Sequence, residues 1–181
     1  MQTRVAIIQG SPRADGNTER AARRLAEGLG HRFAVTLTNL YALDIRRCTG
    51  CRSCMTEGLC VIRDDDFPAL WADLRQAEMI VQACPVYWHA PPGIMKDFID
   101  RTHSTYPHKS YLRSKLAYLV TVGADSGFET CEIVMRSWIT VYGGNVLGTA
   151  RLYARDRGEL DRNPENLRKL DELVASMMSA A

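Results

Sequence analysis

Short runs of apolar residues alternate along the chain with longer stretches whose apolar positions recur every three or four residues. The short runs are rich in β-branched residues and are bounded by turn-forming ones, which is typical of buried strands. This pattern predicts five strands, at Val5–Gln9, Phe33–Asn39, Met79–Ala83, Leu116–Val122 and Val146–Tyr153. The longer stretches predict five helices, because their apolar residues fall on one stripe of a helical surface.

Several of these helices carry start signals. Asp66 is placed to cap the second helix, Pro91 opens the third, and Asn163 precedes a proline at the start of the last. The first helix is expected over about 18–29. The fourth is expected to bury a stripe formed by Phe128, Cys131, Val134, Trp138 and Val141.

Strict alternation of strands and helices predicts an α/β fold in which a five-stranded parallel sheet has helices on both faces. The first loop lacks the G-x-G-x-x-G of a Rossmann fold, and no strand ends in an acid placed for a ribose. The flavodoxin-like order 2-1-3-4-5, a three-layer sandwich, is therefore expected. No linker interrupts the pattern, so residues 1–181 are interpreted as a single domain with a cysteine-rich insertion at 48–60.

Composition excludes several classes of function. The 181 residues carry a net charge of only +2, which is too weak and too evenly spread to indicate nucleic acid or an anionic membrane as partner. Neither a spanning apolar run nor a secretory leader is found, so a cytoplasmic protein is expected. In a reducing compartment, clustered cysteines indicate a metal or redox site rather than disulfides.

The turn after the first strand, Gly10–Thr18, has the chemistry of a phosphate receptor. The N–H groups at the start of the following helix face this turn, and the helix dipole favours an anion there. Ser11, Asn17 and Thr18 add side-chain donors, and Arg13 adds a cation with a planar fork of donors. We therefore expect a phosphorylated ligand at this turn.

Two more loops are expected at the same edge, since the carboxyl ends of strands one, three and four meet there. The loop Cys84–Pro92 is rich in aromatic residues and proline, and its exposed N–H groups could meet the edge of a flat ring. The loop Gly123–Gly127 supplies a third side. The three loops predict a slot for a flat, phosphorylated ring, with Tyr87 and Trp88 offering flat faces. We interpret 102–115 as an exposed loop near this ring, carrying His103 and His108.

Four of the six cysteines lie within thirteen residues, at Cys48, Cys51, Cys54 and Cys60, followed by three aspartates. Cysteines at steps of three can wrap a loop around a compact cluster. Zinc is an alternative, although its ligand pairs usually lie further apart in the chain, and free thiols in a structured loop are another. The remaining Cys84 and Cys131 stand in apolar contexts and are expected to be ordinary buried thiols.

The segments GSPRADGNT and PVYWHAPPGIMKDFIDR resemble the NAD(P)H-dependent FMN reductases of flavodoxin-like fold. The resemblance implies that FMN is the ligand and that NAD(P)H is the co-substrate. It implies a phosphate site at Ser11, Arg13, Asn17 and Thr18, and a ring site along Pro85, Val86, Tyr87 and Trp88, with Gly123 and Ser126 as looser matches. The cysteine run resembles that of the iron–sulfur flavoproteins, which implies a [4Fe–4S] cluster on Cys48, Cys51, Cys54 and Cys60.

We expect an FMN-dependent oxidoreductase that takes hydride from NAD(P)H and passes electrons to a flavin, a quinone or another small acceptor. The cofactor carries this chemistry, so no catalytic side chain is assigned. The alternative is an iron–sulfur flavoprotein that carries single electrons between FMN, the cluster and a ferredoxin-like partner. A non-catalytic protein is a third hypothesis, either a flavin- or nucleotide-binding regulator or a zinc-stabilised interaction module. The resemblance also implies a homodimer or tetramer.

Overall fold

The computed structural model describes residues 2–108 and 110–180, apart from the side chain of His108. Its parallel sheet has the order β2-β1-β3-β4-β5, which confirms the flavodoxin-like prediction. The strands are β1 (Arg4–Gln9), β2 (Ala34–Asn39), β3 (Met79–Pro85), β4 (Leu116–Gly123) and β5 (Asn145–Tyr153). Val5 of β1 is in register with Val35 on one side and Met79 on the other. The central strands are buried along almost their whole length, as both faces are covered.

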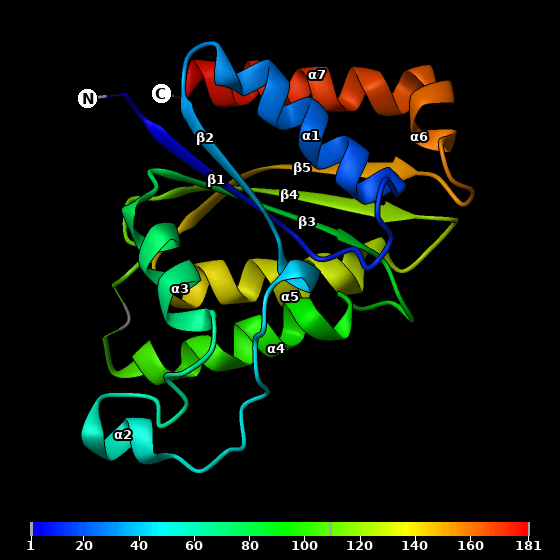
Figure 1. The fold of residues 1–181 in the computed structure, drawn as a ribbon. Coiled ribbons are helices and arrows are strands. Elements are labelled where there is room, and N and C mark those ends of the chain that lie inside the picture. The colour runs from blue at the N-terminus through cyan, green and yellow to red at the C-terminus, as the bar shows by residue number, and fades with distance from the viewer. Residues whose placement is uncertain (1, 109, 181) are drawn as a thin grey trace.

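Helices cover the two faces of the sheet (Figure 1). One face carries α1 (Asn17–Gly30), α6 (Glu159–Arg162) and α7 (Pro164–Ser179). The opposite face carries α3 (Phe67–Gln76), α4 (Gly93–Arg101) and α5 (Phe128–Val141). Two short 3-10 helices, η1 (Leu40–Ala42) and η2 (Thr102–His108), and the five-residue helix α2 (Ser53–Glu57) complete the described elements. None of the helices in this part of the chain is long and apolar enough to cross a membrane.

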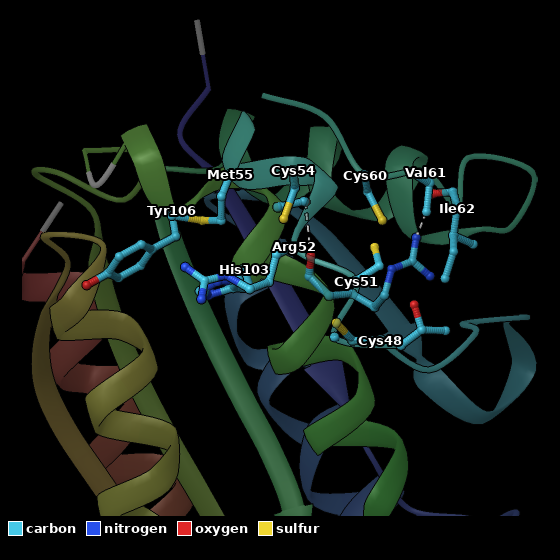
Figure 2. A pocket seen from close by; sticks show the side chains of 14 residues that line it. Cys48, Cys51, Arg52, Cys54, Met55, Cys60, Val61, Ile62, His103 and Tyr106 are labelled. Carbon is cyan, nitrogen blue, oxygen red and sulfur yellow. Dashed lines mark hydrogen bonds between the residues drawn. The ribbon is translucent and has the colours of Figure 1, made fainter. Parts of the chain in front are cut away.

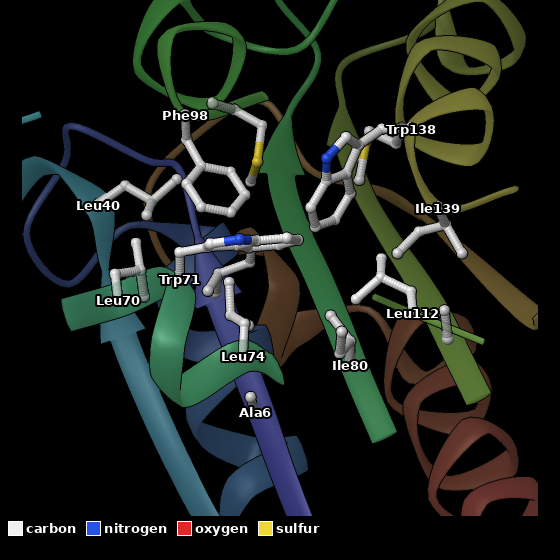
Figure 3. Close-up of a cluster of buried hydrophobic side chains, with 14 of the residues drawn as sticks. Ala6, Leu40, Leu70, Trp71, Leu74, Ile80, Phe98, Leu112, Trp138 and Ile139 are labelled. Carbon is white, nitrogen blue, oxygen red and sulfur yellow. The ribbon is translucent and has the colours of Figure 1, made fainter. Parts of the chain in front are cut away.

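The core beneath α3, α4 and α5 is built around an aromatic cluster (Figure 3). Trp71 lies at its centre, with ring centroids 6.5 Å or less from those of its neighbours. These neighbours are Phe67, Phe98, Tyr111, Trp138 and Tyr142. Because α3 and α4 both anchor in this cluster, the loops at their ends start from fixed positions.

The start of α3 corrects the predicted cap. The helix begins directly after Asp66, but the Asp66 side chain does not cap it. Asp65 accepts the hydrogen bond from the Phe67 N–H at 3.3 Å, while Asp66 accepts one from the Asp44 N–H at 2.8 Å. The acidic run therefore ties the segment before the cysteines to the segment after them. By contrast, Asn163 caps α7 as predicted, accepting from the Glu165 N–H at 3.1 Å.

The stripe expected on the fourth helix is partly wrong. Val141 is 47 % exposed, whereas Glu132 is buried on the inner face of α5. The Glu132 carboxylate accepts hydrogen bonds from Thr121 at 3.0 Å and from Arg151 at 2.8 Å. These bonds to β4 and β5 hold the Glu132 side of α5 against the sheet, so Met135 is fully buried and Val134 only partly.

The segment 102–115 is not the exposed loop that the sequence indicates. Its first part is η2, and Thr102, Ser104 and Leu112 are buried. The Thr102 hydroxyl accepts from the Trp138 indole N–H at 2.9 Å, which holds this segment against α5. It packs against α2 rather than at the carboxyl edge of the sheet. Lys109 and the side chain of His108 lie outside the described residues.

Candidate functional site

The turn after β1 is held in shape by hydrogen bonds between its backbone N–H groups and neighbouring side chains. The Ser11 N–H donates to the Gln9 side-chain oxygen at 2.7 Å, and the Ser11 hydroxyl accepts from the Arg13 N–H at 3.2 Å. A Cβ on Gly16 would lie 3.0 Å from both Cβ and the carbonyl oxygen of Arg13, so the close approach favours glycine. The turn is therefore a preformed cradle at the start of α1.

The first turn of α1 supplies the anion-binding groups. Gly16 stands at the N-cap without a side-chain cap, so the N–H groups of this turn remain available to a ligand. The Thr18 side chain is 2 % exposed and lines the pocket there. The Asn17 amide has a structural role as well, because it donates to the Asp156 carbonyl at 2.9 Å and accepts from the Gly158 N–H at 3.1 Å.

The loop after β3 forms a wall of the same pocket through Pro85, Val86 and Tyr87. Two of the N–H groups expected to face a ring are already used inside the protein: Val86 donates to the Val122 carbonyl at 2.8 Å and Tyr87 to the Ala90 carbonyl at 2.9 Å. Trp88 and His89 form the middle of the resulting tight turn, with φ of 49° and 62°. Their N–H groups donate to no acceptor within the described part of the chain.

Trp88 itself stands outside the pocket. Its side chain is 98 % exposed, because the left-handed turn directs it away from the sheet. The turn is well supported: the Thr130 hydroxyl donates to the His89 carbonyl at 2.7 Å, and a Cβ on Gly127 would meet His89 at 2.9 Å.

The third side of the pocket comes from Gly123 and Ala124 after β4. A Cβ at Gly123 would lie 2.9 Å from the Phe128 ring, which explains the glycine. Ser126 is exposed, donates to the neighbouring Asp125 at 3.0 Å, and does not line the pocket. The structure thus brings eight of the ten expected residues to one pocket and leaves Trp88 and Ser126 outside it.

The end of β5 also contributes to the pocket, although no residue after this strand was among the predicted site residues. Ala154 and Arg155 follow this strand and line the pocket, which has a volume of about 220 Å³. The Arg155 Nη2 atom also lies 3.7 Å from the Asp125 Oδ2 atom. This contribution could have been predicted, because the carboxyl ends of all strands in a parallel sheet lie at one edge, and β5 is one of these strands.

These residues fit FMN. Two arginines, Arg13 and Arg155, and an uncapped helix N-terminus suit a phosphate, and the buried hydroxyls of Ser11 and Thr18 can complete its hydrogen bonds. The Pro85–Tyr87 wall adds apolar surface for a flat ring to the same pocket. The pocket therefore offers both anion-binding groups and a surface for a ring, the two parts that FMN combines.

The four clustered cysteines line a second cavity, of about 460 Å³ (Figure 2). Cys48 and Cys51 are exposed, and Cys54 and Cys60 are half-buried. Left-handed residues on both sides of α2, Arg52 and Gly58, turn the chain so that all four side chains reach this cavity. His103, expected near the ring, lines this cavity instead.

The cysteines differ in their surroundings. Hydrogen bonds from the backbone and hydroxyl of Ser53, and then from Thr49, lower the pKa of the Cys51 thiol. Burial raises the pKa of Cys54. Within residues 2–108 and 110–180, no three His, Cys, Asp or Glu side chains converge tightly enough to hold one metal ion. In a [4Fe–4S] cluster each iron takes one thiolate, so four cysteines around a shared cavity are the donor set that such a group would need.

The two remaining cysteines lie in the core, as predicted, but they also meet. The Cys84 and Cys131 sulfur atoms are 3.6 Å apart, and Cys84 lies 3.3 Å from the Met135 sulfur. The hydrogen bond with Cys131, together with burial, raises the pKa of Cys84 well above its usual value. These thiols are inert packing groups.

The sheet order and the pocket at its carboxyl edge define a flavodoxin-like flavoprotein. A model of the NADPH-dependent FMN reductase family matches residues 3–157, so the chain belongs to this family and is an FMN-dependent oxidoreductase.

Two curated relatives and one solved structure illustrate what this chain is similar to. An iron-sulfur flavoprotein of Archaeoglobus fulgidus is 31% identical over 177 residues, which are 96% of this chain and 78% of the relative. One from Methanosarcina thermophila is 29% identical over 146 residues, 78% of this chain and 75% of the relative. The structure of an NAD(P)H:quinone oxidoreductase from Methanothermobacter marburgensis has a TM-score of 0.77 at 15% identity, covering 97% and 94% of the two chains. This last likeness shows the fold.

Proposed function

We propose that this chain is an iron–sulfur flavoprotein, with FMN at the carboxyl edge of the sheet and a [4Fe–4S] cluster on Cys48, Cys51, Cys54 and Cys60. One observation carries the proposal: four cysteines from a single loop all line one cavity of about 460 Å³. The names of the Archaeoglobus and Methanosarcina relatives support it.

In this proposal the residues around the sheet edge bind and orient FMN. The first turn of α1, with Thr18 and Arg13, holds the phosphate, and Pro85–Tyr87 supports the ring. FMN, when bound, supplies both two-electron and one-electron chemistry. The tight turn at Trp88 and His89 leaves its two N–H groups without a partner among the described residues, so they can meet the ring edge or a substrate.

The cysteine loop provides the one-electron site. Hydrogen bonds from Ser53 lower the pKa of Cys51, which favours the thiolate form that binds iron. A [4Fe–4S] cluster, when bound, supplies transfer of single electrons. The exposure of Cys48 and Cys51 leaves this site open to an external protein, for which we propose a ferredoxin-like electron carrier. We also propose that the chain self-associates, as the family resemblance implies.

The test is a metal count on protein that is reconstituted anoxically with FMN, iron and sulfide. We expect about four iron atoms and four acid-labile sulfides per chain, the composition of one cluster. Cys54→Ser should lose most of this iron, whereas Cys131→Ala, which removes a thiol outside the loop, should keep it. A yellow protein with a flavin spectrum alone and no iron would contradict the proposal.

A second function is favoured by the separation of the two sites. The FMN pocket and the cysteine cavity share no lining residue, so the FMN site is complete without a cluster. The protein would then pass electrons from NAD(P)H to a flavin, a quinone or another small acceptor. We expect the FMN-loaded, iron-free Cys54→Ser variant to oxidise NAD(P)H with a quinone in a steady-state assay. Absence of turnover with every such acceptor would remove this function.

A further inference from the structure

Arg101, the last residue of α4, is a buried cation at the base of the cysteine loop. Its side chain and that of Asp65 are both 0% exposed, and they form an ion pair. One guanidinium nitrogen also donates to the Arg46 carbonyl at 2.8 Å, and another donates to the Ile62 carbonyl at 2.9 Å. Arg101 therefore joins the two ends of the loop that carries the four cysteines.

The third nitrogen of this side chain, Nε, differs from the other two. The Arg101 Nε is buried and has no hydrogen-bond partner among the described residues. An N–H group of a cation that is buried without an acceptor is costly, so such a group calls for an explanation. Phe67 covers one face of the guanidinium, with its ring centroid 4.7 Å from the central carbon. The side chain also lines the cysteine cavity together with Cys60.

The charge of Arg101 is maintained in this position. Burial opposes it, but the hydrogen bond and charge of Asp65, followed by the neighbouring Cys60, raise the pKa of the guanidinium above its usual range. A permanently charged donor thus lies next to one of the four cysteines.

We propose that the Arg101 Nε–H, which has no partner among the described residues, donates a hydrogen bond to the Cys60 sulfur once a cluster is bound, and that Arg101 is thereby a positioning residue for the cluster. This inference rests on the proposed function. Hydrogen bonds to cluster sulfurs and nearby positive charge favour the reduced, more negative form. Arg101 then has two tasks: two of its nitrogens close the loop, and the third adjusts the redox equilibrium of what the loop holds.

The test compares Arg101→Lys with the wild type in an anoxic redox titration of the reconstituted protein, followed by electron paramagnetic resonance. Lysine keeps the charge opposite Asp65 but removes the Nε donor. We expect the ratio of reduced to oxidised cluster at a given potential to fall about tenfold, a shift of about 59 mV for one electron. Arg46→Lys is the matched control, because Arg46 pairs with the adjacent Asp64 from the same loop but does not line the cavity. A potential equal to that of the wild type would overturn the proposal.

The iron count separates the inference from the proposed function. An Arg101→Lys protein that binds about four iron atoms but has the potential of the wild type would overturn the inference and leave the proposed function standing. Failure of the wild type to bind iron would contradict the proposed function, and the inference with it. If the lysine variant does not fold, the pair Asp65→Asn with Arg101→Gln removes both charges together and serves in the same titration.

Discussion

Replacing Asp65 with alanine is expected to lower the free energy of unfolding by about 3–5 kcal/mol, the cost of leaving one partner of a buried ion pair alone. The Asp65 side chain is fully buried against Arg101, so the substitution leaves an uncompensated guanidinium. Asp65 also accepts hydrogen bonds from the Arg46 N–H at 3.0 Å and the Phe67 N–H at 3.3 Å. Urea denaturation followed by circular dichroism measures the loss.

The neighbouring Asp64 supplies the control. It is 82% exposed and pairs with Arg46 at the surface, so Asp64→Ala should change stability little.

The pH dependence of stability provides a second test of the ion pair. Burial opposes ionisation of Asp65, but the hydrogen bond and charge of Arg101 lower its pKa. The wild type should therefore lose this contribution as the pH falls below about 3.9, the value of a free aspartate, whereas Asp65→Ala should not. Equal urea midpoints for the wild type and Asp65→Ala would show that the ion pair between Asp65 and Arg101 does not stabilise the protein.

Replacing Thr18 with valine is expected to weaken FMN binding about 10- to 100-fold. The side chain is 2% exposed in the first turn of α1 and lines the phosphate end of the pocket. Valine has nearly the same shape but cannot donate a hydrogen bond, and a hydrogen bond to a charged group contributes about 1.5–3 kcal/mol. Isothermal titration calorimetry of the apo-protein with FMN measures the change in Kd.

Thr140→Val is the matched control for this substitution. Thr140 is also a helical threonine, but its hydroxyl donates to the Arg136 carbonyl on the exposed side of α5. The control should bind FMN as the wild type does. An unchanged Kd in Thr18→Val would place the phosphate elsewhere, and riboflavin, which has no phosphate, should bind both threonine variants equally.

The fold was largely predictable because its signals are local and repeated. Buried parallel strands are continuous apolar runs, and the absence of a Rossmann glycine pattern after β1 decided the strand order. The phosphate cradle was predictable for a related reason. A turn between a buried strand and a helix has a fixed position, and the first N–H groups of the helix have no partner within the helix, so they favour an anion.

Side-chain direction was harder to predict. Trp88 follows the wall residues in sequence, but its left-handed backbone turns the indole into solvent, and non-glycine residues rarely adopt this conformation. No sequence pattern singles out Arg101, a charged residue in the last turn of a helix. Its burial depends on Asp65, 36 residues earlier, and such a long-range pairing has no local signal.

The exposure of Trp88 gives the protein a built-in optical reporter. Of the three tryptophans, Trp71 and Trp138 are 3% and 5% exposed, whereas Trp88 is 98% exposed beside the FMN wall. An aqueous quencher such as iodide should therefore quench the red-shifted part of the tryptophan fluorescence, which comes from Trp88. The fluorescence of the two buried tryptophans should change little. Docking of any large molecule over that turn would become visible as protection from the quencher, without a label.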